Sequence, residues 1–128
     1  MRWTGAALAG GILMAIAVPA AAAPGDMTLA TFLAKADALK KRGALALLSS
    51  DFSLLKSEVE ASNQAYIARL QADRAANRAP HSCPPQRAGM SSDELLAHFE
   101  SYPAAQRTRT TVRQGFFDLM RRRFPCAA

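Results

Sequence analysis

The sequence is poor in the residues on which most enzyme and metal sites are built. Its 128 residues include only two cysteines, two histidines, two tyrosines and one tryptophan. It has no Gly-x-Ser-x-Gly turn, no His-Glu-x-x-His helix and no glycine-rich phosphate loop. Aspartate and glutamate are common enough for a carboxylate pair, but their spacing singles out none. These absences argue against an enzyme, and we predict no catalytic residue, no metal site and no cofactor.

Charge is missing from the start of the chain, where no charged residue lies between Arg2 and Asp26. Residues 6–18 are apolar, and four consecutive alanines further on fit an Ala-x-Ala cleavage site. An uncleaved membrane anchor is the alternative. Against it, the strongly apolar part is shorter than the roughly 20 residues that a membrane span requires. The sequence therefore predicts a signal peptide over residues 1–23, a periplasmic protein, and no stable membrane span after cleavage.

Export would place the two cysteines in an oxidising compartment, where a disulfide is the expected state. An even count in an oxidising compartment favours one disulfide, between Cys83 and Cys126. Both cysteines lie beside prolines, which keep these parts of the chain out of helices. A redox or metal pair is the weaker alternative, because the spacing is far from Cys-x-x-Cys. On the chain-entropy model the bond stabilises the fold by about 4 kcal/mol.

The mature chain, residues 24–128, is short enough to form a single domain. Without Arg2 it holds 15 basic and 10 acidic residues, so its formal charge is +5. Such a balance is typical of proteins that meet nucleic acid, an anionic surface or an acidic protein. Export, and the lack of RNA-binding motifs or zinc-finger spacing, argue against nucleic acid. A solvated basic surface without a specific partner is the simplest alternative.

Apolar residues recur at helical spacing and nowhere alternate with period two for long enough to form a strand. The first helix is expected over 29–39, with Thr28 as its N-cap and Gly43 as its stop. A further helical turn follows over 44–48. A long second helix is expected to begin at a cap formed by Asp51 or a nearby serine.

A proline-rich loop over 77–90 separates these helices from two more. Ser91 to Glu94 fit a capping box, in which the serine hydroxyl and the glutamate carboxylate each satisfy a backbone N–H. The third helix is expected to end before Pro103, and the last to begin near Thr108 or Thr110. The sequence therefore predicts an all-α protein, a small bundle of about four main helices with one disulfide.

Four short motifs occur together in the C-terminal part of the chain. They are Cys83-Pro84, Met90-Ser91-Ser92-Asp93-Glu94-Leu95-Leu96, Tyr102-Pro103 and Phe124-Pro125-Cys126. This combination resembles the C-terminal half of the Rap/Tai family, small exported helical proteins that protect bacteria from cell-wall amidase effectors delivered by type VI secretion. The resemblance implies a binding protein that occludes a toxin's active site in the periplasm, and it also implies that the two cysteines are bonded.

The N-terminal half departs from the family pattern. The family usually carries a second cysteine pair, one on the first helix and one before a Gly-Tyr-Ile-like element. Ala65-Tyr66-Ile67 is similar to that element. However, Asn63 stands where the cysteine is expected, and the first helix has none. The resemblance therefore rests on the C-terminal half of the chain.

Two groups of polar residues are candidates for contact with a partner. The first group lies in the loop over 77–90, whose conformation the disulfide and three prolines would restrain. Its members are expected to be exposed: His81, Ser82 and Arg87. The second lies at the start of the last helix and could grip an acidic surface: Arg107, Arg109 and Arg113. The alternative for these arginines is that they only tune solubility. Glu94 and His98 are expected to form an exposed pair on one helix face.

We expect from these observations an exported, non-enzymatic binding protein of the immunity type. Its partner would be a protein, in the sharpest version a cell-wall-degrading amidase effector. The alternative is an envelope-associated structural or stress protein that binds anionic cell-wall material or lipid headgroups. The sequence leaves a homodimer open.

Overall fold

The computed structural model describes residues 23–127, and within this range it is built of helices. The elements are α1 (Leu29–Arg42), the 3-10 helix η1 (Gly43–Leu48), α2 (Ser50–Ala75), α3 (Ser92–Glu100), α4 (Ala104–Arg107) and α5 (Val112–Arg123). The prediction of a small all-α bundle is confirmed. The predicted signal peptide, residues 1–23, lies outside the described residues except for its last position. Among residues 23–127, none of the helices combines the length and the apolar character of a membrane-spanning segment.

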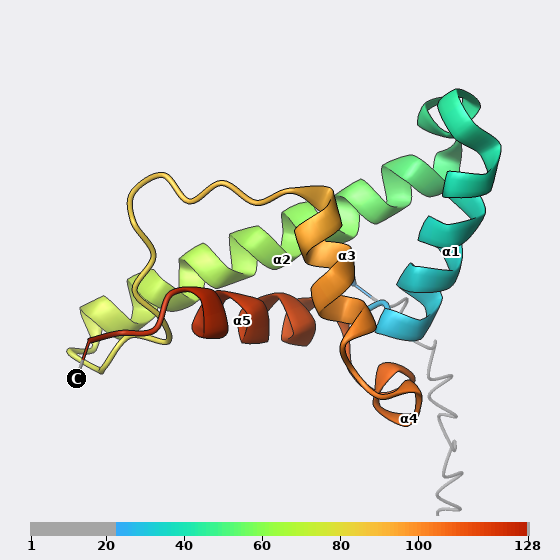
Figure 1. Ribbon diagram of the computed structural model, residues 1–128. Coiled ribbons are helices and arrows are strands. Elements are labelled where there is room, and N and C mark those ends of the chain that lie inside the picture. The colour runs from blue at the N-terminus through green and yellow to red at the C-terminus, as the bar shows by residue number, and fades with distance from the viewer. Residues whose placement is uncertain (1–22, 128) are drawn as a thin grey trace, which may run out of the picture.

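The long helix α2 runs the length of the molecule and organises the others (Figure 1). α5 packs along it, α1 and η1 pack at its N-terminal end, and α3 lies against α1 and α5. The core between them is apolar and includes Leu29, Phe32, Phe99, Val112 and Phe116, all buried. Beyond α2 the chain arches away from the helices before it returns at α3 (Figure 1).

Both expected ends of the first helix and the expected start of the second are confirmed. The Thr28 hydroxyl accepts the backbone N–H of Thr31 at 3.2 Å and caps α1. Gly43 ends α1 with a φ of 63°, a conformation that favours glycine. The cap of α2 is Ser49, whose hydroxyl accepts the N–H of Phe52 at 3.2 Å. The further turn expected over 44–48 is present as η1.

The start of α3 is only partly as predicted. The Ser91 hydroxyl accepts the N–H of Glu94 at 3.1 Å, as expected for the cap. The Glu94 carboxylate does not complete a capping box, because it is paired with Arg123 Nε at 2.9 Å. This ion pair binds the first turn of α3 to the last turn of α5.

The complete capping box lies instead at α5. The Thr111 hydroxyl accepts the N–H of Gln114 at 3.1 Å, and the Gln114 side chain accepts the N–H of Thr111 at 2.9 Å. The predicted start of this helix near Thr108 or Thr110 is therefore slightly too early. The residues before it form α4, a single short turn that the sequence pattern did not indicate.

Cys83 and Cys126 are bonded, with an S–S distance of 2.03 Å and Cα atoms 5.0 Å apart. Beside the disulfide, the N–H of Cys83 donates to the carbonyl of Phe124 at 2.8 Å. The bond therefore fastens the loop after α2 to the end of α5, as predicted.

Candidate functional site

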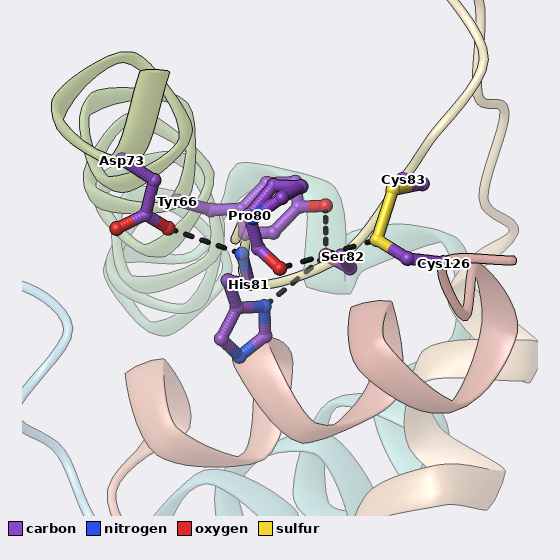
Figure 2. Close-up of a disulfide and its surroundings, with 7 residues drawn as sticks. All are labelled: Tyr66, Asp73, Pro80, His81, Ser82, Cys83 and Cys126. Atoms are coloured by element: carbon purple, nitrogen blue, oxygen red, sulfur yellow. Dashed lines mark hydrogen bonds between the residues drawn. A yellow bond between two sulfur atoms is a disulfide. The ribbon is translucent and has the colours of Figure 1, made fainter. Parts of the chain in front are cut away.

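A buried carboxylate organises the chain between α2 and the disulfide (Figure 2). Asp73 is fully buried and accepts the backbone N–H of His81 at 3.0 Å. The guanidinium groups of Arg69 and Arg78 each lie 3.0 Å from its carboxylate. Burial alone would raise the pKa of Asp73, but the hydrogen bonds from Arg69, His81 and Arg78 outweigh it and hold the pKa below the ordinary value of 3.8. A charged Asp73 therefore fixes the first part of the loop to the end of α2.

The expectation that Ser82 is exposed is wrong, because only 2% of this residue is accessible. Its hydroxyl is hydrogen-bonded to the Tyr66 hydroxyl and lies 3.1 Å from His81 Nδ1 (Figure 2). His81 is half-buried, and its ring meets those of Tyr66 and Phe117 edge-on. Burial and the charges of Arg121 and Arg69 lower the pKa of His81. The side chains of His81 and Ser82 therefore contact each other and Tyr66, and only the expected exposure of Ser82 is contradicted.

The His81–Ser82 contact lacks the features of a nucleophile and its base. In a catalytic triad the carboxylate orients the imidazole ring. Here Asp73 instead binds the backbone N–H of His81. Ser82 is also almost inaccessible. In the part of the chain that the structure describes, no group of three or more metal-ligating side chains lies together. The contact between His81 and Ser82 therefore differs from a catalytic triad in the partner of the carboxylate and in the burial of the hydroxyl.

Arg87 differs from these two residues, since it lies in the exposed part of the loop. Residues 85–89 are all exposed, and both sides of this stretch are fastened to the end of α5. Cys83 is held by the disulfide, while the Arg123 side chain donates to the carbonyl of Gly89. The structure thus presents Arg87 on a loop that is tethered at both ends.

The three arginines near the start of α5 do not form one surface. Arg107 is directed to its own chain, where its Nε donates to the carbonyl of Tyr102 at 2.8 Å. Arg113 pairs with Asp26 at 3.0 Å. Only Arg109 is exposed. Arg107 and Arg113 thus each hold a neighbouring segment of this chain, and contact of either residue with a partner stays a prediction.

The structure also shows a buried acidic residue that the sequence analysis missed. The Glu58 carboxylate accepts the N–H of Gly25 at 2.7 Å and that of Met27 at 3.2 Å. Only 5% of Glu58 is exposed. A glutamate on a long helix gives no sequence signal of this role, because its partners are backbone groups more than thirty residues away.

His98 is buried and does not form the expected exposed pair with Glu94. Its Nε2 lies 3.4 Å from the Tyr102 hydroxyl, which donates to Asp118 at 2.5 Å. Burial lowers the pKa of His98. Burial also raises the pKa of Tyr102, and the hydrogen bond to the Asp118 carboxylate adds to this effect. A neutral histidine is therefore part of the packing between α3 and α5.

The described residues form an apolar groove of about 640 Å³. Its lining residues come from α1, η1, α2, α3 and α5 and from the end of the loop. Its walls are largely aliphatic and aromatic and include Phe32, Leu39, Leu55, Val59, Leu95 and Met120. Its volume lies in the range of about 300–1,000 Å³ that is usual for small-ligand pockets. No sequence pattern indicates this groove, because its residues are far apart in the chain.

These features define a small all-α, disulfide-bonded protein with a tethered loop and an apolar groove. Comparison of the chain with models of protein families, with curated proteins and with solved structures finds no match.

Proposed function

We propose that this protein is an exported, non-enzymatic binding protein of the immunity type. It neutralises a cell-wall-degrading amidase effector in the periplasm, and the exposed loop over 85–89 makes the central contact. The observation that carries the proposal is that both ends of this loop are fastened to one short segment, 123–126.

The fastening matters because a loop that becomes ordered on binding loses affinity. The disulfide and the N–H of Cys83, which donates to Phe124, hold one end. Arg123 holds the other end at Gly89, and the adjoining Met90 packs against the apolar core. A loop held in this way can enter a concave partner surface at a low entropic cost.

The chemistry of the loop agrees with a protein partner. Its exposed side chains include Gln86 and Arg87, and arginine is enriched among residues that dominate binding energies. The positive charge of the mature chain would also speed its encounter with an acidic partner. The loop also lies within residues 83–126, the part of the chain that resembles the Rap/Tai family.

The experiment compares the double variant Gln86→Ala, Arg87→Ala with a matched control, Arg74→Ala, which removes an exposed arginine of α2 that is not a predicted contact residue. A pull-down from periplasmic and secreted fractions identifies the partner, and calorimetry measures the affinity. The loop variant is expected to bind on the order of ten-fold more weakly, with an unchanged unfolding midpoint. The control is expected to bind like the wild type.

Inhibition of the captured partner is the functional readout. The wild-type protein is expected to block release of peptide from peptidoglycan by the partner, and the loop variant to block it less. A partner without amidase activity would contradict the proposed function. Release of product from peptidoglycan by the purified protein alone would contradict its non-enzymatic part.

A further inference from the structure

The turn η1 lies at the opposite end of the molecule from the C-terminus (Figure 1). It exposes large aliphatic side chains. Leu45, Leu47 and Leu48 of η1 are 73%, 64% and 86% exposed. Leu54, in the first turns of α2, is also exposed. We call these four residues the leucine edge. Large exposed apolar patches are typical of sites of interaction with a protein or a membrane.

The leucine edge is continuous with the apolar groove. Leu47 belongs to both, and the neighbouring Phe52, itself 37% exposed, also lines the groove. The groove therefore opens toward the edge, and its apolar wall continues onto the outer surface. A molecule with a long apolar part could cross from the edge into the groove without leaving apolar contact.

Basic residues stand next to this apolar surface. Lys40, Lys41 and Arg42 form the last turn of α1, directly before η1, and all three are exposed. Lys41 pairs with Asp37, whereas Lys40 and Arg42 enter no ion pair among residues 23–127. Lys40 also lines the groove. Lys40 thus lies where the apolar surface meets the groove, and Arg42 is two residues further along the same turn.

The positive charge of this region distinguishes between two candidate occupants of the apolar surface, a second copy of the chain and an anionic bilayer. In a symmetric contact with a second copy, the leucine edges would bring two basic clusters together, and their like charges would repel. An anionic bilayer offers the opposite charge together with an apolar interior. Exposed leucines flanked by lysine and arginine are typical of segments that lie in a membrane interface.

We propose that the leucine edge docks on an anionic lipid bilayer and that the groove takes one acyl chain of an anionic lipid. The leucines enter the boundary between headgroups and acyl chains. Lys40 and Arg42 bind the phosphate of the headgroup, and the acyl chain lies along Val59 and Leu95. Of residues 85–89 only Ala88 lines the groove, and Gln86 and Arg87 do not. The lipid site therefore uses other side chains than the proposed immunity contact and is tested independently of it.

The docking experiment uses the protein purified after export, with its N-terminus determined by mass spectrometry. Binding is measured by co-sedimentation with vesicles of phosphatidylglycerol and phosphatidylethanolamine. The wild type is expected to bind these vesicles, more weakly at high salt, and to bind vesicles of phosphatidylcholine far less. Replacing all three leucines of η1 by serine is expected to lower binding by on the order of ten-fold or more. Lys40→Gln and Arg42→Gln are each expected to lower it by about five-fold.

Two matched controls distinguish loss of the proposed lipid site from the general effect of removing an apolar side chain or a positive charge. Ile67→Ser removes a partly exposed apolar side chain of α2 outside the groove, and Arg74→Gln removes an exposed charge at the far end of that helix. Both are expected to bind vesicles like the wild type. The loop variant Gln86→Ala, Arg87→Ala is also expected to do so, and failure of the proposed immunity function would leave this result unchanged.

The groove is tested with a single-chain probe, lysophosphatidylglycerol, by native mass spectrometry. Asn63 is exposed and lines the groove, so Asn63→Trp is expected to fill the groove without disturbing the core. The variant is expected to lose the bound probe and to keep the wild-type unfolding midpoint. Unchanged vesicle binding by the η1 serine variant would overturn the docking proposal. Undiminished probe binding by Asn63→Trp would overturn the acyl-chain site. If the wild-type protein forms a dimer and the η1 serine variant does not, the leucine edge is instead the contact between two copies of the chain.

Discussion

The carboxylate of Glu58 accepts the backbone N–H of Gly25 at 2.7 Å and thereby fixes the beginning of the described chain to the middle of α2. Gly25 has a φ of 99°, in the left-handed region that favours glycine. A Cβ at this position would lie 2.9 Å from the Arg113 side chain. Because Arg113 also pairs with Asp26, α2 and α5 hold the segment before α1 from two sides.

Glu58→Ala is expected to lower the free energy of unfolding by about 2–4 kcal/mol, because the N–H groups of Gly25 and Met27 lose their buried acceptor. Chemical denaturation measures the difference. Glu60→Ala, on the exposed face of the same helix, is the control and is expected to change little. Equal effects of the two substitutions would mean that the Glu58 contacts do not stabilise the folded protein.

The disulfide should be the main covalent support of the loop. Cys126→Ser is expected to lower the free energy of unfolding by about 2–4 kcal/mol, because the unfolded chain regains the freedom of a long loop. The double variant with Cys83→Ser separates this effect from that of a free thiol. Thiol labelling of the native protein without reductant should find no reactive cysteine, and two labelled thiols per chain would contradict the bond.

Asp73 should make the fold sensitive to acid. Its folded pKa lies below the value of about 3.9 in an unfolded chain, so its stabilisation is present above that value and is lost as the pH falls through the folded pKa. Asp73→Asn is expected to destabilise the protein at neutral pH and to flatten the loss of stability below about pH 4. Asp37→Asn, on the exposed surface of α1, is the control. The measurement is the unfolding midpoint as a function of pH. Parallel curves for the wild type and Asp73→Asn would show that ionised Asp73 does not stabilise the fold.

The features that could be predicted from the sequence are local or covalent. Thr28 and Ser91 cap helices because an N-cap needs only a hydroxyl three residues before the bonded N–H. The pairing of Cys83 with Cys126 followed from their number and from the expected export. Such signals depend on the chain near one residue, or on a count, and they do not require the fold.

The features that could not be predicted depend on contacts between distant segments. Ser82 and His98 look like ordinary exposed polar residues in the sequence, yet the fold buries them against Tyr66 and Tyr102. Glu94 fits a capping box, but a stronger partner, Arg123, arrives from another helix. Charge and spacing alone therefore could not show which polar residues remain free to bind a partner.

The two histidines should make stability depend on pH in the neutral range. Burial lowers the pKa of His98, between Tyr102, Asp118 and Arg122, and burial also lowers that of His81. An unfolded chain takes up these protons near pH 6.5 while the folded protein does not, so stability is full above that pH and falls as the pH drops from about 7 to 5.

His98→Gln removes a titrating group and leaves a polar side chain of similar size in its place. Its stability is expected to be lower at pH 7.5, because the packing on Phe99 and Tyr102 is weakened. Its loss of stability between about pH 7 and 5 is expected to be smaller than that of the wild type. Adding His81→Gln is expected to reduce further the loss of stability that remains over this pH range. Thermal unfolding midpoints across this range measure both slopes. A wild-type stability that rises as the pH falls would reverse the sign and show that these histidines gain charge favourably in the folded protein.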